Sequence, residues 1–371
     1  MEKYFEDLLQ HYDKLSDAEK TYWYKARHYV LNIMEPLDGD GISPKSSDSV
    51  HVVVKDIDNP LVQAVVRQIC LIAHYPNFNE DKEEDKDIHR TLITIYSDNP
   101  ENTYNDLNDS RILGNLLDYC KCNIEPEKAT RKIVPLDIEF EFLHSGSCST
   151  EGATAIISTD ELKNCPDDFD REMDVTKGIL VNMVYSTGAV IGNLPATDNA
   201  NIKRYSTALN VFCYNLKSDR IYQKWCECKR VKDKLSSVFC ADCFEARIKG
   251  LVNTKEKTLV EYILKDFDTV MKKVCDENTL TALARCEHSR WNVEKLILDF
   301  LPLHESDWYE LENCFGEERK NKIKVLKKEL NKHIDLCSYK DLRRIDPANI
   351  KYDYFLMLAM PQIMRSYLLI K

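Results

Sequence analysis

One short stretch of the chain, residues 283–295, gathers side chains that could bind a ligand or take part in chemistry. It contains a carboxylate, an imidazole, a guanidinium, an indole and an ammonium group, which belong to Glu287, His288, Arg290, Trp291 and Lys295. Helix-forming residues surround these groups, and residues three or four apart on a helix share a face. His288, Trp291 and Lys295 therefore line one stripe. A solvent-exposed helix face rarely contains a tryptophan, and a face buried in a hydrophobic core rarely contains charged groups. This stripe contains both.

Two interpretations of this helix stay open. In the first, its charges are paired inside the protein and hold a small helical domain together, as buried charges usually do when they are paired. In the second, the helix lines a ligand pocket that includes His288. Trp291 and Tyr339 would offer flat faces to a nucleobase, and Glu287 would accept hydrogen bonds from ribose or amino groups. Phosphate would be bound by cationic side chains, for which the candidates are Arg290, Lys295 and Arg343.

The length, net charge and cysteine content of the chain exclude several classes of protein. The 371 residues suffice for two or three domains, and the formal net charge of −11 argues against a general nucleic-acid binder. A local basic pocket could still accept a small anion. No apolar run reaches the ~18 residues of a membrane span, and the charged amino terminus is no secretory signal. The 14 cysteines then indicate reduced thiols, so we expect a cytoplasmic protein.

The pattern along the chain predicts an α/β fold followed by a helical one. Strands and helices alternate in the middle of the chain, which favours a Rossmann-like parallel sheet with flanking helices. The expected domains are amino-terminal helices and a linker at 1–47, the Rossmann-like domain at 48–218, connecting helices at 219–274 and a small helical domain at 275–371. The expected strands are 51–54, 91–96, 132–143, 154–157 and 178–184. The expected helices of the middle region are 60–72, 104–121, 198–217 and 219–249.

The remaining motifs argue against an enzyme and against a bound metal or cofactor. A dinucleotide-binding turn needs glycines where the first strand meets its helix, and residues 55–60 contain none. The pairs Cys226–Cys228 and Cys240–Cys243 have the spacing of thiolate ligands, but a continuous helix between them would hold them about 21 Å apart. We therefore expect a non-catalytic protein without a metal or a cofactor.

The carboxyl-terminal part, residues 275–371, resembles the Ryr domain, a small helical module named for its repeats in ryanodine receptors and also found in bacterial proteins. Residues 287–291, Glu-His-Ser-Arg-Trp, together with Lys295 are similar to the Glu-His-x-x-Trp signature of the family's first helix. Residues 333–342 are similar to the family's His-Pro-x-Leu-x-Pro-Tyr-x-x-Leu segment, without its two prolines. An insertion near 302–330 separates the two segments.

The middle of the chain looks like the Rossmann-type domain of TrkA-like potassium-channel regulators, which some bacterial Ryr proteins carry ahead of the Ryr module. The similarity rests on the alternation of strands and helices and on the run at 69–76, and the family's glycines are absent. The two resemblances imply a bacterial regulatory or sensor protein whose Ryr-like part binds a nucleotide-type small molecule, in antiviral defence signalling. Two alternatives stay open. One is a structural adaptor that forms homo-oligomers or recruits a protein through its amino-terminal helices, and the other is an NAD(P)-dependent enzyme.

Overall fold

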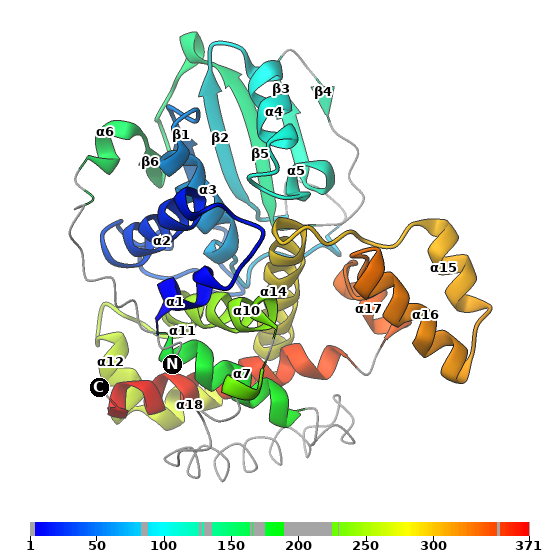
Figure 1. Cartoon of the computed structure of the whole chain (residues 1–371). Coiled ribbons are helices and arrows are strands. Elements are labelled where there is room, and N and C mark those ends of the chain that lie inside the picture. Colours follow the sequence, from blue (N-terminus) through cyan, green and yellow to red (C-terminus); the bar gives the residue numbers. More distant parts are fainter. Residues whose placement is uncertain are drawn as a thin grey trace.

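A six-stranded sheet lies at one end of the molecule, and helices fill the other end (Figure 1). The computed structural model describes residues 4–82, 88–125, 128–129, 136–163, 165, 175–188, 225–228, 230–346 and 349–370. The expected helix at 198–217 lies outside these ranges, as do residues 132–135 of the expected strand at 132–143. The strand bounds are β1 (His51–Val54), β2 (Thr91–Ser97), β3 (Lys121–Ile124), β4 (Lys128–Ala129), β5 (Ile138–His144) and β6 (Ala155–Ile157).

The sheet is parallel apart from one short edge strand. Its order is β4–β3–β5–β2–β1–β6, and only β3 and β4 pair antiparallel. In the centre, Val53 lies opposite Thr94 of β2 and Ile156 of β6. Parallel strands are covered on both faces and therefore read as continuous apolar runs, and Val53 is indeed 0% exposed. The five parallel strands with flanking helices confirm the α/β class predicted from the sequence.

The amino-terminal helices α1 (Phe5–Gln10) and α2 (Asp17–Asn32) bury their apolar side chains against their own chain. Ser16 and Glu19 form a capping box in which each side chain accepts from the backbone N–H of the other, at 3.3 and 2.8 Å. Trp23 of α2 is 1% exposed, and α2 packs against α3 (Pro60–Ile72), the helix that follows β1. A partner recruited by these helices would therefore contact their outer, polar side.

The expectation of a strand at 178–184 is wrong, because these residues lie in helix α7 (Thr176–Gly188). Helix α7 packs against α10 (Val231–Asp242) and α18 (Ile350–Ile370). Its middle residues are consequently apolar on nearly all sides and show no helical period. A short apolar run of this kind fits a buried strand and a buried helix equally well.

The single helix expected over 104–121 is wrong in its extent. The chain forms α4 (Pro100–Asp109), then the short α5 (Leu116–Tyr119), and enters β3. Between the two helices, Arg111 and Gly114 have φ angles of 56° and 58°. This left-handed backbone conformation ends a helix, so the segment turns twice where the sequence pattern indicates one element.

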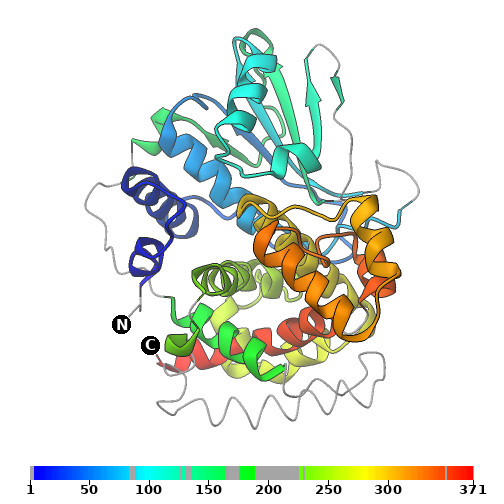
Figure 2. The same cartoon turned by 45° about the vertical axis from the view of Figure 1, so that its right-hand side comes forward.

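Helix α14 (Glu277–Ile297) lies between the sheet and the other helices, as both Figure 1 and Figure 2 show. It contacts α3, α5, α10, α13 (Phe267–Val274), α17 (Tyr339–Ile345) and α18. One hydrophobic core runs from the sheet into α14 and α18 and includes Val52, Leu283 and Met357. None of the described helices is both long enough and apolar enough to cross a membrane. The remaining helices named below are α11 (Phe244–Lys249), α15 (Glu305–Glu312) and α16 (Gly316–Glu329).

Candidate functional site

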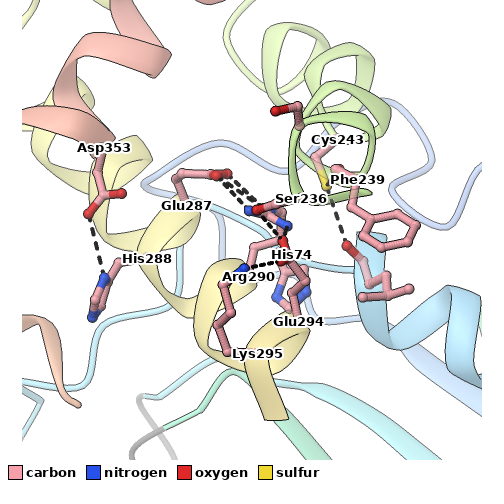
Figure 3. Close-up of polar contacts among 12 residues, drawn as sticks. His74, Ser236, Phe239, Cys243, Glu287, His288, Arg290, Glu294, Lys295 and Asp353 are labelled. Carbon is pink, nitrogen blue, oxygen red and sulfur yellow. Dashed lines mark hydrogen bonds and ion pairs between the residues drawn. The ribbon is translucent and has the colours of Figure 1, made fainter. Parts of the chain in front are cut away.

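The polar side chains of α14 form two groups on different sides of the helix (Figure 3). One group faces α10 and α11, and the other faces α17 and α18. The helix starts at a well-formed cap, since Asp276 Oδ1 accepts from the Thr279 N–H at 3.0 Å. Because α14 is packed against neighbours along its length, both groups stand on a rigid element.

The first group is a chain of five buried charges. The Glu287 carboxylate accepts from Arg247 Nη1 at 2.7 Å and from Arg290 Nη2 at 2.9 Å. Arg290 Nη1 donates to Glu294 Oε2 at 2.7 Å, and Lys295 Nζ donates to Glu294 Oε1 at 2.6 Å. All five side chains are at most 8% exposed. With three cations and two carboxylates, these five side chains together carry a net charge of +1.

The network keeps its carboxylates ionised. Burial raises the pKa of Glu287, but the positive charges of Arg290 and Arg247 outweigh it and lower this pKa to about 2. Glu287 therefore stabilises the fold above its ordinary pKa of 4.5, and this stabilisation is lost as the pH falls from 4.5 towards 2. The arrangement fits the first interpretation of the helix, in which paired charges hold the domain together.

The second group centres on His288. Its Nδ1 lies 3.5 Å from Asp353 Oδ2, and its Nε2 lies 3.0 Å from the Cys337 carbonyl oxygen. Asn292 Nδ2 donates to the same carbonyl at 2.8 Å. Burial works against a charged ring, but the hydrogen bonds to Asp353 and Cys337 raise the pKa of His288 to about 10. With an acceptor at each ring nitrogen, the imidazole is held as a cation.

We expect the stability of the protein to depend on pH through His288. Because the folded state raises its pKa, the stabilisation is fully present below the ordinary pKa of 6.5 and is lost between 6.5 and about 10. In urea unfolding, His288→Gln should lower the free energy of unfolding by about 2 kcal/mol at pH 6 and by much less at pH 9.5. The same change at the exposed His304 serves as the control. An equal loss at both pH values would contradict a charged His288.

Aromatic rings surround the second group; Trp291 is partly exposed, whereas His288, His333 and Tyr339 are buried. The His288 and Trp291 rings are 6.0 Å apart and inclined by 17°, and the His333 ring meets Trp291 edge-on at 4.8 Å. The Tyr339 ring lies 5.7 Å from His288. Trp291 is partly exposed, and Lys295 Nζ lies 5.3 Å from its ring centroid. The buried network and the rings thus meet at Lys295 and Trp291, and we call these rings with Lys295 the aromatic surface.

The structure divides the predicted site residues between the two groups. Glu287 and Arg290 are 1% exposed and bond each other, so neither can meet a ligand unless the network breaks. The other five predicted residues lie on or beside the aromatic surface: His288, Trp291, Lys295, Tyr339 and Arg343, the last with its guanidinium carbon 5.0 Å from the Tyr339 ring centroid.

Several partners of these residues are not among the predicted site residues. Glu294 had a signal in the sequence, because it lies four residues after Arg290, the spacing of a helical ion pair. Arg247 and Asp353 belong to α11 and α18, and only the tertiary fold brings them to α14. His333 opens the segment that resembles the Ryr domain, but nothing in its neighbourhood along the chain indicates its contact with Trp291.

The turn after β1 is filled by its own side chains. Asp56 has a φ angle of 56°, and its carboxylate accepts from the N–H and the hydroxyl of Thr159 at 3.0 and 2.7 Å. At the start of α3, Asn59 Oδ1 accepts from the N–H groups of Leu61 and Val62 at 2.9 and 3.4 Å. A Rossmann fold places a pyrophosphate at this helix terminus. Here a carboxylate and an amide occupy that region, which argues against a dinucleotide in the usual position.

Two of the four cysteines with ligand-like spacing, Cys240 and Cys243, are buried as structural thiols, whereas Cys226 is exposed and Cys228 is partly exposed. Cys240 and Cys243 are each 1% exposed, and burial raises the pKa of Cys243 to about 12. The Cys243 thiol donates to the Phe239 carbonyl at 3.4 Å. Within the described residues, no three His, Cys, Asp or Glu side chains are arranged to hold a metal ion.

A polar junction joins α14 to the sheet. Ser289 Oγ donates to Asp137 Oδ1 at 2.6 Å, and His74 Nδ1 lies 2.9 Å from both oxygens of Asp137. Asp137 directly precedes β5, so the junction lies at the amino ends of the parallel strands, beside a small cleft that Tyr75 and Arg90 help to line. Ligands of parallel sheets bind at the carboxyl ends of the strands. We therefore assign the junction a structural role, which is to fix α14 to the sheet.

No protein-family model, curated protein or solved structure matches the chain. The geometry around α14 is therefore the basis on which a function is proposed below. The resemblance of residues 275–371 to the Ryr domain, and of the middle region to the TrkA-like Rossmann-type domain, stays a prediction from the sequence.

Proposed function

We propose that the protein is a non-catalytic ligand-binding regulator and that the aromatic surface of α14 binds a nucleotide-type small molecule. The observation that carries the proposal is the position of Trp291, a partly exposed indole with the ammonium group of Lys295 5.3 Å from its ring centroid. An indole face stacks on a nucleobase, and a neighbouring cation binds the phosphate attached to it.

The surroundings of Trp291 favour binding because they hold the indole in place. His288 backs one side of the ring and is itself fixed by Asp353 and by the Cys337 carbonyl. His333 packs against the indole edge-on. A surface that is ordered before the ligand arrives loses less conformational entropy on binding.

The contacts of α14 suggest how binding would be transmitted. Ser289 bonds the sheet through Asp137, Glu287 bonds α11 through Arg247, and His288 lies beside Asp353 of α18. A ligand that binds one arrangement of these contacts more tightly than another shifts the population towards it. In this proposal the Ryr-like part senses the ligand and the α/β part transmits the signal, in the bacterial antiviral defence that the Ryr resemblance implies.

A titration with cyclic nucleotides and ADP-ribose-type nucleotides tests the proposal. We expect at least one of them to bind the full chain in isothermal titration calorimetry, and Trp291→Ala to weaken that binding about 10-fold or more, because base stacking on an aromatic ring contributes about 1–3 kcal/mol. Trp308→Phe on α15 is the matched control and should leave the affinity unchanged. The proposal fails if no nucleotide binds, or if Trp291→Ala is folded by circular dichroism and binds as tightly as the wild type.

A further inference from the structure

We propose that the aromatic surface continues into a phosphoryl-binding niche formed by Lys295, Lys327 and His333. The niche would take a phosphate or pyrophosphate group, either free or as part of a nucleotide. This inference rests on the proposed function, because the niche would bind the anionic part of the ligand whose base stacks on the aromatic surface.

The niche is walled by rings. The His333 ring centroid lies 4.8 Å from that of Trp291 and 6.0 Å from that of Phe300. Lys295 Nζ lies 5.3 and 5.9 Å from the same two rings. The N–H of His333 donates to the Leu301 carbonyl at 3.0 Å, which fixes the backbone that carries the imidazole. Cationic heads held against apolar walls interact with an anion more strongly than they would in open water.

Helix α16 supplies a lysine to this region. The N–H of Lys332 donates to the Leu326 carbonyl at 2.9 Å, which holds the last turn of α16 beside the segment that carries His333. Lys327, in that turn, is partly buried and forms no ion pair with any residue that the structure describes. Burial lowers the pKa of Lys327, and the charge of Arg230 lowers it further. The charged form of a lysine that is partly buried beside other cations is unfavourable unless an anion binds close to it.

His333 lies near several of these positive charges. Burial and then four neighbouring positive charges hold the pKa of His333 well below its usual range. In decreasing order of effect, these charges belong to Lys327, Lys295, His288 and Arg230. Nδ1 of His333 accepts from the Asp335 N–H at 3.2 Å, so the neutral ring carries its proton on Nε2.

Two carboxylates neutralise only part of this positive charge. Asp233 pairs with Arg230 at 2.6 Å. Glu294 bonds Lys295 but is shared with a second cation of the buried network. Beyond these two pairs, the charge of Lys327 and the net positive charge of the buried network remain, and Asp335 faces Lys327.

A third carboxylate lies at the edge of the niche. Asp335 Oδ2 is 3.9 Å from His333 Nδ1 and accepts from Asn349 Nδ2 at 2.8 Å. Burial and the charge of Asp346 raise the pKa of Asp335 to about 6. Because its pKa is already raised, Asp335 readily takes up a proton when an anion binds nearby.

Inorganic pyrophosphate is the probe that tests the niche on the full chain. We expect calorimetry to show binding, and nuclear magnetic resonance to show that the His333 ring becomes more basic as pyrophosphate binds, because an anion offsets the surrounding cations. Lys327→Met should weaken the binding about 10-fold, as expected for the loss of one charge-assisted contact. Lys324→Met, an exposed lysine on the same helix, is the matched control and should have no effect.

The outcomes separate this niche from the proposed function. The niche is overturned if pyrophosphate does not bind, if Lys327→Met binds it as tightly as the wild type, or if Lys324→Met weakens it equally, which would indicate surface charge alone. If pyrophosphate binds through Lys327 but nucleotides bind no more tightly and Trp291→Ala has no effect on them, the niche stands and the stacking part of the proposed function fails.

Discussion

Glu287→Gln is expected to lower the free energy of unfolding by about 3–5 kcal/mol, as the removal of one partner from a buried ion pair does. The substitution leaves Arg247 and Arg290, which are 0% and 1% exposed, facing a neutral amide. Arg247 depends on this carboxylate in particular, since its Nε and Nη2 find no hydrogen-bond partner among the described residues. Urea unfolding at pH 7 measures the loss.

Two controls show whether burial causes this effect. Glu317→Gln removes a carboxylate that also pairs with a cation, Lys320 at 3.2 Å, but both side chains are 76% exposed, so the change should cost less than about 0.5 kcal/mol. In addition, the wild type should lose stability between pH 4.5 and 2, and Glu287→Gln should lose less over that range. A loss below about 1 kcal/mol at pH 7 would show that the two arginines do not need Glu287.

The sequence predicts the fold well where local pattern and tertiary environment agree. β1 contains a short apolar run and β2 is rich in apolar and β-branched residues, and turn residues bound both strands; the parallel sheet that they indicate is confirmed. The segment 178–184 is just as apolar, but it is buried among helices rather than in the sheet. Its hydrophobicity reports burial alone, so no local signal separates the two outcomes.

The candidate site was only partly predictable for a different reason. The spacing of polar residues on α14 identifies Glu287, Arg290 and Trp291 as unusual, but it does not say which of them are buried. That depends on α11 and α18, which supply Arg247 and Asp353. The residue types on one helix show which charged and hydrogen-bonding groups it carries. The residues that pair with those groups belong to elements far away in the sequence.

Gly114→Ala is expected to lower the free energy of unfolding by about 3 kcal/mol or more. Gly114 has a φ angle of 58°, which costs another residue about 1–2 kcal/mol. A Cβ at this position would also lie 2.3 Å from the Leu296 carbonyl oxygen and 2.6 Å from that of Ile297. These atoms belong to the last turn of α14, whose Leu296 carbonyl accepts from the Asn115 N–H at 2.9 Å. Since neither backbone can yield easily, the added methyl group must push α14 away from the α4–α5 turn, at a further cost of about 1–3 kcal/mol.

Gly152→Ala separates the two causes of the Gly114 effect. Gly152 also has a positive φ, of 72°, but a Cβ there meets nothing within 4 Å. Thermal and urea unfolding should therefore show a loss of only about 1 kcal/mol for Gly152→Ala. If the two variants lose the same amount, backbone conformation alone explains Gly114 and the close contact with α14 contributes nothing. If Gly114→Ala loses clearly more, as we expect, the end of α14 is held against the sheet-side turn by backbone contact, and the aromatic surface near that end inherits its rigidity from the α/β part of the fold.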